Sequence, residues 1–311
     1  MSQKAVHRLA VVTLVATLLL VAFGGFTRGS GSGFGCADRW PLCQDGLLGG
    51  LLPRPEYHMI VEWTHRWLAA TVGVLALATA FSAWRGHLDR RRVVMPAVAA
   101  VIAIGIQAWL GRMVVKGDLA ADLVTLHLGV SMIVVGLETA TAVGAASLPA
   151  SDRGRDPAWI ARLAVGAIGA YALIILGSLV HNQYFAGWPI MSSGVLPSFT
   201  SAAAVTHYGH RLLAAVGAVY LGYLVWQAFR RHRSVWEIRL VVAALIFHLG
   251  AAALGAVHVF THVTSSLAVA LHLGIAALMW TALVAATLIA ATAPSVASPR
   301  QPEPTAEIPA E

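Results

Sequence analysis

Eight runs of about 20 or more predominantly apolar residues constrain the fold of this chain more than any other feature of its sequence. The hydrocarbon core of a bilayer is about 30 Å thick, and a helix needs roughly 20 apolar residues to cross it. Only 11% of the residues are charged, against about 25% in an average soluble domain. We therefore predict an all-α integral membrane protein with eight transmembrane helices. The predicted spans cover residues 9–27, 59–84, 93–115, 120–147, 160–181, 203–229, 238–259 and 264–292.

The first apolar run could also be the core of a signal peptide, because Lys4 and Arg8 precede it and small residues follow it. Its apolar core is longer than that of a typical signal peptide. The run also has a counterpart at the start of the second half of the chain. We therefore predict that it is retained as a transmembrane helix.

The positive charges of the chain, whose formal net charge is +7, gather in alternate loops. In multi-pass membrane proteins such loops face the cytoplasm, so both termini are predicted to be cytoplasmic. The stretches 182–202 and 258–263 contain neither Lys nor Arg. Nucleic acid is excluded as a partner, because the arginines are spread over three short loops without an interleaved aromatic surface. The basic loops carry Arg85, Arg90, Arg91 and Arg92, then Arg153, Arg155 and Arg162, then Arg230, Arg231, Arg233 and Arg239.

The chain contains an internal repeat. The segment HRWLAATVGV at 65–74 matches HRLLAAVGAV at 210–219, and LHLG at 126–129 matches LHLG at 271–274, both 145 residues later. Because each half holds four spans, both halves start on the same side of the membrane, as parallel repeats do.

We therefore predict two pseudo-symmetric four-helix bundles, formed by residues 1–150 and 151–292. Residues 293–311 are rich in Pro, Ala and Glu and carry no apolar period. They are predicted to form a disordered cytoplasmic tail.

Each half carries a pair of histidines at the same spacing. His65 and His127 are 62 residues apart, and so are His210 and His272. In each half both histidines lie in spans that start at the outer face, so they are expected at similar depth. Two facing imidazoles at one level of a four-helix bundle suit the two axial positions of a haem iron. Zinc suits the site less well, because a closed zinc site needs four ligands and neither core contains a cysteine.

A buried histidine is more often a hydrogen-bonded structural residue than a ligand, but repetition at identical spacing favours ligation. Other histidines compete for these roles. His181, His248, His258 and His262 are rival ligands, the last two being interface or haem-edge candidates, whereas His7, His58, His87 and His232 are loop or interface residues.

An arginine directly follows the first histidine of each pair. Arg66 and Arg211 could hold haem propionates, because a guanidinium group binds a carboxylate at two points. Alternatively, the two side chains extend to the outer lipid headgroups.

The two halves differ beside these histidines. Glu62 lies three residues before His65, one helical turn away, where the second half has His207. A carboxylate beside a haem pocket could act as a base or stabilise a developing positive charge. The alternative is an interfacial glutamate that pairs with Arg66 or Arg112.

Cys36 and Cys43 are the only cysteines, and both lie in the first outer loop. In an oxidising compartment they can pair. The corresponding loop of the second half has no cysteine. A structural staple and a redox-active disulfide both remain open.

The eight spans, the blocks EWTHR (62–66) and LHLG, their echoes HYGHR (207–211) and LHLG, and the cysteine pair together resemble haem A synthases of the Gram-positive bacterial type. The resemblance covers nearly the whole chain apart from the tail. It implies oxidation of the methyl group at position 8 of haem O to a formyl group, giving haem A for terminal oxidase assembly. Haem O synthase and the oxidase assembly machinery are implied partners, and a bacterial cell membrane is the implied location.

The resemblance also implies a role for each residue singled out above. His65 and His127 would bracket the iron of the substrate haem O, Glu62 would be the catalytic acid or base, His210 and His272 would ligate a permanent haem b, and Cys36 and Cys43 would form an outer-loop disulfide that passes electrons on.

Two histidine ligands leave no open iron position for oxygen. Two hypotheses follow. Either His65 or His127 releases the iron during turnover, or water supplies the oxygen atom with the help of Glu62.

Two other functions compete with this interpretation. A di-haem b electron-transfer protein linked to quinone would explain both histidine pairs but gives Glu62 and the cysteines no role. A transporter built on parallel repeats would need polar groups at mid-membrane, whereas the spans are mostly Ala, Val and Leu.

Overall fold

The computed structural model describes residues 2–43, 45–147, 154–182, 201–260 and 264–292. These residues form eight long helices and no β-strand, and each helix is long and apolar enough to cross a membrane. The predicted all-α fold with eight spans is therefore confirmed. The helices are α1 (Gln3–Gly29), α2 (Tyr57–Arg85), α3 (Met95–Lys116), α4 (Ala121–Ala145), α5 (Pro157–Asn182), α6 (Ala202–Arg230), α7 (Val235–Phe260) and α8 (Ser266–Thr292).

Polar residues just outside the apolar runs start several helices. Ser2 Oγ accepts a hydrogen bond from the Ala5 N–H at 3.4 Å, and Ser201 Oγ accepts one from the Ala204 N–H at 3.2 Å. Such caps satisfy backbone donors that have no partner within the helix. Helix α1 therefore begins at Gln3 rather than at residue 9. Its backbone hydrogen bonds continue beyond the end of the apolar stretch.

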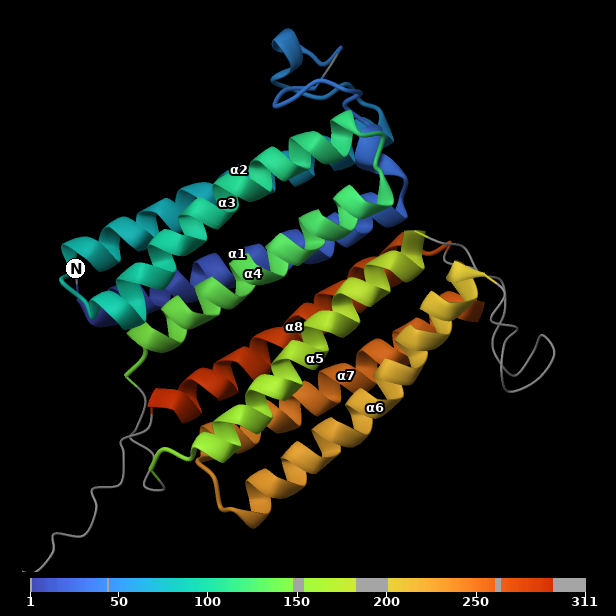
Figure 1. Ribbon diagram of the computed structural model, residues 1–311. Helices are drawn as coiled ribbons and strands as arrows, with labels where there is room; N and C mark the ends of the chain where they lie inside the picture. The colour runs from blue at the N-terminus through green and yellow to red at the C-terminus, as the bar shows by residue number, and fades with distance from the viewer. Residues whose placement is uncertain (1, 44, 148–153, 183–200, 261–263, 293–311) are drawn as a thin grey trace, which may run out of the picture.

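Three short helical turns accompany the eight long helices in the described part of the chain. The turns η1 (Ser32–Phe34) and η2 (Leu48–Gly50) belong to the loop between α1 and α2, which projects beyond the helix ends in Figure 1. The turn η3 (Arg90–Val94) leads directly into α3. An isolated β-bridge between Leu47 and Leu52 closes part of the projecting loop.

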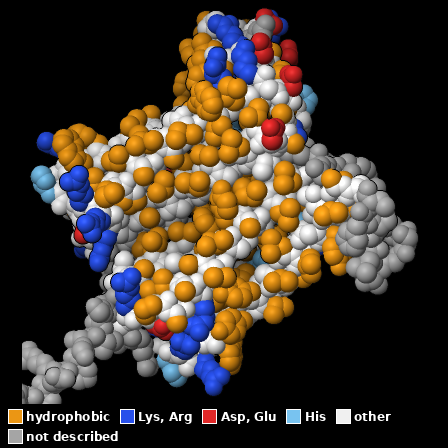
Figure 2. Space-filling view, viewed as in Figure 1, with side chains coloured by type: hydrophobic (Ala, Val, Ile, Leu, Met, Phe, Trp, Pro, Cys, Tyr) orange, Lys and Arg blue, Asp and Glu red, His pale blue; other side chains and the backbone are white. Residues whose placement is uncertain are grey.

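The helix bodies present apolar side chains outward. Leu77, Phe81, Ile102, Ile168 and Val219 are each more than half exposed. Figure 2 shows such side chains covering the middle of the molecule, with Lys and Arg gathered towards its ends. An apolar surface of this extent suits hydrocarbon rather than water as the solvent.

Helices α1–α4 lie side by side, and so do α5–α8 (Figure 1). The two groups meet where α1 and α4 pack against α8 and where α4 packs against α5. Trp280 Nε1–H donates to the Met132 carbonyl across this contact at 3.0 Å. A β-carbon at Gly25 would stand 3.3 Å from the Ala270 Cα, so α1 and α8 approach closely. The domain boundaries and the pseudo-symmetry of the two groups remain predictions.

Some predictions fall on parts of the chain that the structure does not describe. The tail (293–311), His262 and most of the loop 182–202 lie outside the described residues. The first apolar run forms α1, which packs against α2, α4 and α8.

Candidate functional site

Each of the four predicted iron ligands packs against a glycine of the preceding helix. His65 on α2 lies so close to Gly24 on α1 that a β-carbon at Gly24 would stand 3.2 Å from the imidazole Cε1. The absence of a side chain therefore provides the space that each ring occupies. The corresponding distances are 3.3 Å for Gly111 and His127, 3.0 Å for Gly177 and His210, and 3.5 Å for Gly255 and His272.

Three of these imidazoles have a buried ring nitrogen without a hydrogen-bond partner, although the ring of His210 also forms a hydrogen bond with the backbone of Leu173. The buried Nδ1 atoms of His65, His127 and His210 have no partner among the described residues. His272 differs, because its Nδ1–H donates to the Ala251 carbonyl at 2.8 Å. Buried polar atoms usually find a partner, so rings without one are candidates for binding another ligand. His65 and His127 also lie close enough to interact electrostatically.

The rival histidines share some of these features: a β-carbon at Gly217 would stand 3.1 Å from the His248 Cε1, and the buried Nδ1 of His258 also has no partner among the described residues. The Nε2–H of His248 donates to the Ala214 carbonyl at 2.8 Å, which is the kind of bond that holds a structural residue. The rings of His258 and His272 meet edge to face with centroids 5.3 Å apart. His58 Nδ1 lies 3.0 Å from the Ser32 hydroxyl. The side chain of His181 lies outside the described part of the structure.

The described residues do not form a binding site for a bare metal ion. Within the described residues, no three His, Cys, Asp or Glu side chains cluster as ligands of such an ion do. The glycine-backed imidazoles instead fit a haem, whose porphyrin supplies the other ligands of the iron. Metal binding itself remains a prediction.

Glu62 is almost fully buried, with 3% of its surface exposed. Its carboxylate forms an ion pair with the Arg66 guanidinium, whose Nε–H donates to Oε1 at 3.1 Å and whose second nitrogen also contacts Oε1. The backbone N–H of Cys36 donates to Oε2 at 2.6 Å. These donors stabilise the ionised form of the carboxyl group. Of the two predicted interfacial partners, Arg66 rather than Arg112 is the one that pairs with it.

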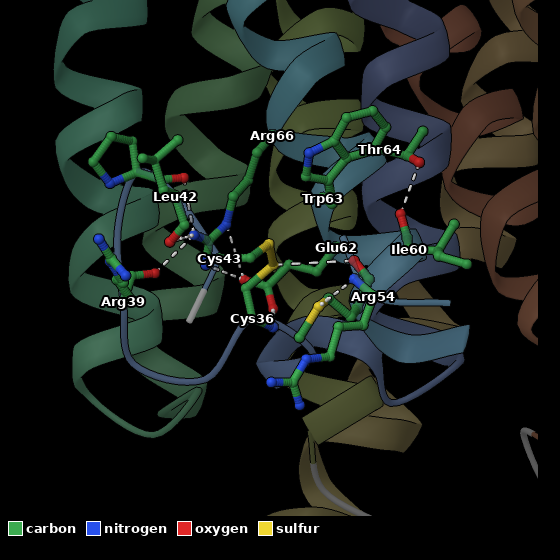
Figure 3. The surroundings of a disulfide bond; sticks show 12 residues. Cys36, Arg39, Leu42, Cys43, Arg54, Ile60, Glu62, Trp63, Thr64 and Arg66 are labelled. Carbon is green, nitrogen blue, oxygen red and sulfur yellow. Dashed lines mark hydrogen bonds and ion pairs between the residues drawn. A yellow bond between two sulfur atoms is a disulfide. The ribbon is translucent and has the colours of Figure 1, made fainter. Parts of the chain in front are cut away.

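Arg66 also holds the outer loop in place. One of its terminal nitrogens donates to the backbone carbonyls of Arg39 at 2.7 Å, Pro41 at 3.1 Å and Leu42 at 3.4 Å. Figure 3 shows the guanidinium reaching from α2 into the loop between these groups. The described contacts of Arg66 therefore go to Glu62 and to the loop. A propionate contact for Arg66 or for Arg211 remains a prediction.

Cys36 and Cys43 form a disulfide in this loop. Both cysteines are buried, with 0% and 1% of their surfaces exposed, and they pack with Met59 and Trp63 of α2. Thiol–disulfide exchange requires attack on an accessible sulfur atom. Burial therefore favours the structural staple over the redox-active disulfide.

The second half lacks this arrangement around its first histidine. His207 takes the place of Glu62 one turn before His210, and the two rings interact electrostatically. A carboxyl group that pairs with an arginine one turn before the first histidine of a pair is thus a property of the first half alone.

An open pocket of about 400 Å³ lies beside the loop and was not predicted from the sequence. Its cations suit carboxylate groups such as propionates. A sequence signal existed, because Arg112 and Lys116 lie at the outer end of the third predicted span, on the same face as the loop that carries Arg39. The pocket is lined by Asp38, Arg39, Trp40, Arg112 and Lys116.

Comparison with known proteins assigns nearly the whole chain to one family. A family described as cytochrome oxidase assembly protein (COX15-CtaA) matches residues 7–50 and 52–284. A protein named heme A synthase from Listeria monocytogenes is 27% identical over 271 residues, which cover 84% of this chain and 88% of that protein. Another of that name, from Alkalihalophilus pseudofirmus, is 28% identical over 76% of this chain and 82% of its own length. A third, from Bacillus licheniformis, is 36% identical over 42% of each chain.

Proposed function

This chain belongs to the cytochrome oxidase assembly protein (COX15-CtaA) family, and from that premise we propose that it is a haem A synthase. It would oxidise the methyl group at position 8 of haem O to a formyl group. The curated relatives that cover most of the chain are named heme A synthase. That name does not favour the alternative, a di-haem electron carrier.

The observation that carries this proposal is the buried Glu62 carboxylate one turn before His65. The second half has the histidine pair but no carboxylate at the matching place. An electron carrier with two similar haems would not need this difference. A group that takes part in the oxidation is needed only where the substrate binds.

We assign the substrate haem O to the first half, between His65 and His127. The glycines behind both rings and their free Nδ1 atoms support this assignment. His210 and His272 would hold a haem b in the second half, and this group would supply one-electron redox chemistry when bound. The hydrogen bond from His272 to the Ala251 carbonyl would fix the orientation of its ring.

Glu62 would act as the acid–base group. Its pairing with Arg66 and with the Cys36 N–H opposes the effect of burial and favours the ionised carboxylate, whose first step would be to accept a proton. Both partners also fix its position, because one belongs to the same helix and the other to the loop. The loop would then serve to orient Glu62, and its disulfide would limit how far the loop can move.

The conversion of a methyl to a formyl group is a four-electron oxidation that adds one oxygen atom. If water is the source, the balance is one methyl group and one water giving one formyl group, four protons and four electrons, and a separate electron acceptor in the membrane would take up the electrons. If O₂ is the source, a histidine must first leave the iron, because two axial ligands leave no open position.

The location and partners follow the same proposal. The eight spans are those of a multi-pass membrane protein, and the basic loops favour cytoplasmic termini. Haem O synthase would supply the substrate, and assembly of the terminal oxidase would take up haem A.

Substitution of a histidine in each pair tests the assignment of haem O to the first half and of haem b to the second. Purified His210→Ala protein should lack haem b, whereas purified His65→Ala protein should keep it and lose the ability to convert added haem O. Haem type and amount are measured by chromatography and mass. If His65→Ala removes haem b and His210→Ala does not, the assignment of the halves is reversed.

A further inference from the structure

A second buried carboxyl group lies in the first group of helices, away from the histidines. Glu138 on α4 is 3% exposed, and neither of its carboxyl oxygens has a hydrogen-bond partner among the described residues. It faces a cavity of about 10 Å³ that Thr13, Thr79 and Thr141 also line, roughly the space that one water molecule needs. An ionisable group within a membrane span is costly and marks a candidate functional site.

The hydroxyl groups around this cavity offer acceptors rather than donors. Each can direct its hydrogen to a backbone carbonyl of its own helix, and the Thr13 and Thr79 hydroxyl oxygens also lie 2.9 Å apart, so that one of these two can instead donate to the other. The Thr17 hydroxyl can also donate to Glu138, but its hydrogen is shared with the Thr13 carbonyl. An ionised carboxylate, which only accepts, is therefore poorly satisfied here, whereas a protonated carboxyl group can donate to the hydroxyl oxygens. The hydroxyl-to-carbonyl bonds are Thr13 to Leu9 (2.9 Å), Thr17 to Thr13 (3.0 Å), Thr79 to Leu75 (2.8 Å) and Thr141 to Leu137 (2.9 Å).

The charged groups on neighbouring elements do not neutralise Glu138. On α8 the only titratable residue is His272, and α3 has none before Arg112. The basic turn η3 approaches α4 further along, where a β-carbon at Gly144 would overlap the Arg92 carbonyl. On α5 the nearest charged residue in this direction is Arg162, whose carbonyl accepts a bond from Tyr220 of α6.

On α1 the titratable residue facing this end of α4 is His7. Its Nδ1–H donates at 3.0 Å to the carbonyl of Ala142, which lies one helical turn beyond Glu138. His7 is half-buried at the start of α1, beside the basic loops. It therefore stands between the cavity and the face of the protein that carries those loops.

The second half has no such cluster. At the 145-residue offset of the repeat, apolar residues from the hydrophobic core of the second group replace Glu138 and the two threonines of α2 and α4 that line the cavity. Leu224 replaces Thr79, Leu283 replaces Glu138 and Ala286 replaces Thr141. The fold therefore does not require polar groups at these positions.

We propose that Glu138 and the threonines around it form a proton-binding site. The carboxyl group is protonated at neutral pH, holds one water in the cavity, and exchanges its proton with the basic face of the membrane protein by way of His7. The site lies about 16 Å along α4 from His127, at 1.5 Å per residue, so it is separate from the haem ligands.

Infrared spectroscopy of the full-length protein in lipid vesicles tests this proposal. At neutral pH the spectrum should contain the carbonyl band of a protonated carboxyl group, and the band should shift when H₂O is replaced by D₂O. A spectrum without a protonated carboxyl group overturns the proposal, as does a band that does not shift after long exposure to D₂O.

Variants assign the band. Glu138→Gln and Glu138→Leu should each abolish the carbonyl band. Leucine is the residue that the second half carries at the matching position, Leu283. Glu237→Gln is a matched control, because Glu237 is equally buried but pairs with Arg233 at 2.7 Å and should contribute no such band. A band that survives both Glu138 substitutions overturns the assignment, and a wild-type spectrum without any such band overturns the proposal even if neither variant folds.

The exchange of the proton by way of His7 is tested with the His7→Ala variant, which should retain the carbonyl band but slow its shift in D₂O. An unchanged rate of exchange would contradict the role of His7. These readouts do not depend on haem A formation, so they stand or fall separately from the proposed function.

Discussion

The backbone N–H of Cys36 donates a 2.6 Å hydrogen bond to the carboxylate of Glu62. This contact joins the disulfide loop to α2 one turn before a predicted haem ligand. Because Arg66 binds both the carboxylate and three loop carbonyls, the loop and Glu62 form one unit. The geometry of the acid–base group thus depends on residues up to 26 positions away in sequence.

Glu62→Gln should lower haem A formation by about 100-fold or more, the usual contribution of a positioned acid–base group. The amide keeps the size of the side chain and can still accept from Cys36, but it cannot accept a proton or carry the charge. Haem A is measured per haem b in membranes. Glu56→Gln, at an exposed position next to α2, is the matched control and should be silent. Unchanged haem A formation in Glu62→Gln would remove this residue from the mechanism.

The Cys36–Cys43 disulfide should resist reduction in the folded protein, because both sulfur atoms are buried. With a mild thiol reductant and an alkylating reagent, we expect no labelling under native conditions and labelling of both cysteines after denaturation. The chain has no other cysteine, so mass measurement is unambiguous. Replacing both by serine should destabilise the loop by about 2–3 kcal/mol. Rapid labelling of the native protein would instead support a redox-active pair.

A side chain at a glycine behind an iron ligand should displace the imidazole. Gly177→Val should weaken haem b retention by about tenfold or more, since overpacking costs about 1–3 kcal/mol. Gly169→Val on the same helix is the control, because no atom lies within 4 Å of a β-carbon there. Haem b per chain is measured by absorbance after purification. Equal haem content in the two variants would show that the space behind His210 is unimportant.

The source of the formyl oxygen separates the two mechanistic hypotheses. With water as the source, heavy-oxygen water should label the formyl group of newly made haem A, with exchange of the finished aldehyde controlled in parallel. Mass spectrometry of the extracted pigment measures the label. Label that comes only from heavy-oxygen O₂ would require a histidine to leave the iron.

The eight spans were predictable because each membrane crossing needs about 20 apolar residues, and apolar runs of that length are rare in other kinds of segment. The partner of Glu62 could not be predicted, because the sequence allowed either Arg66 or Arg112. The structure decides between them, since three backbone carbonyls of the loop hold the Arg66 guanidinium beside Glu62. These carbonyls belong to Arg39, Pro41 and Leu42. Such contacts depend on loop backbone geometry, which has no sequence period.

Two other features were missed although signals for them existed. Gly24 and Gly177 sit in helices where glycine is common, so their contacts with His65 and His210 appear only in three dimensions. The sequence did contain a signal for Glu138. It is the only acidic residue of α4 beyond the first turn, and the repeat aligns it with Leu283. The roles of the four histidines remain predictions.

The most direct test of the central claim is to express the chain with a haem O synthase in a host that makes no haem A. The pigments are then extracted and identified by chromatography and mass. A haem A synthase predicts haem A in the extract, and its loss in the Glu62→Gln variant. Haem b alone, at about two per chain and with haem O available, would contradict the account and favour an electron carrier.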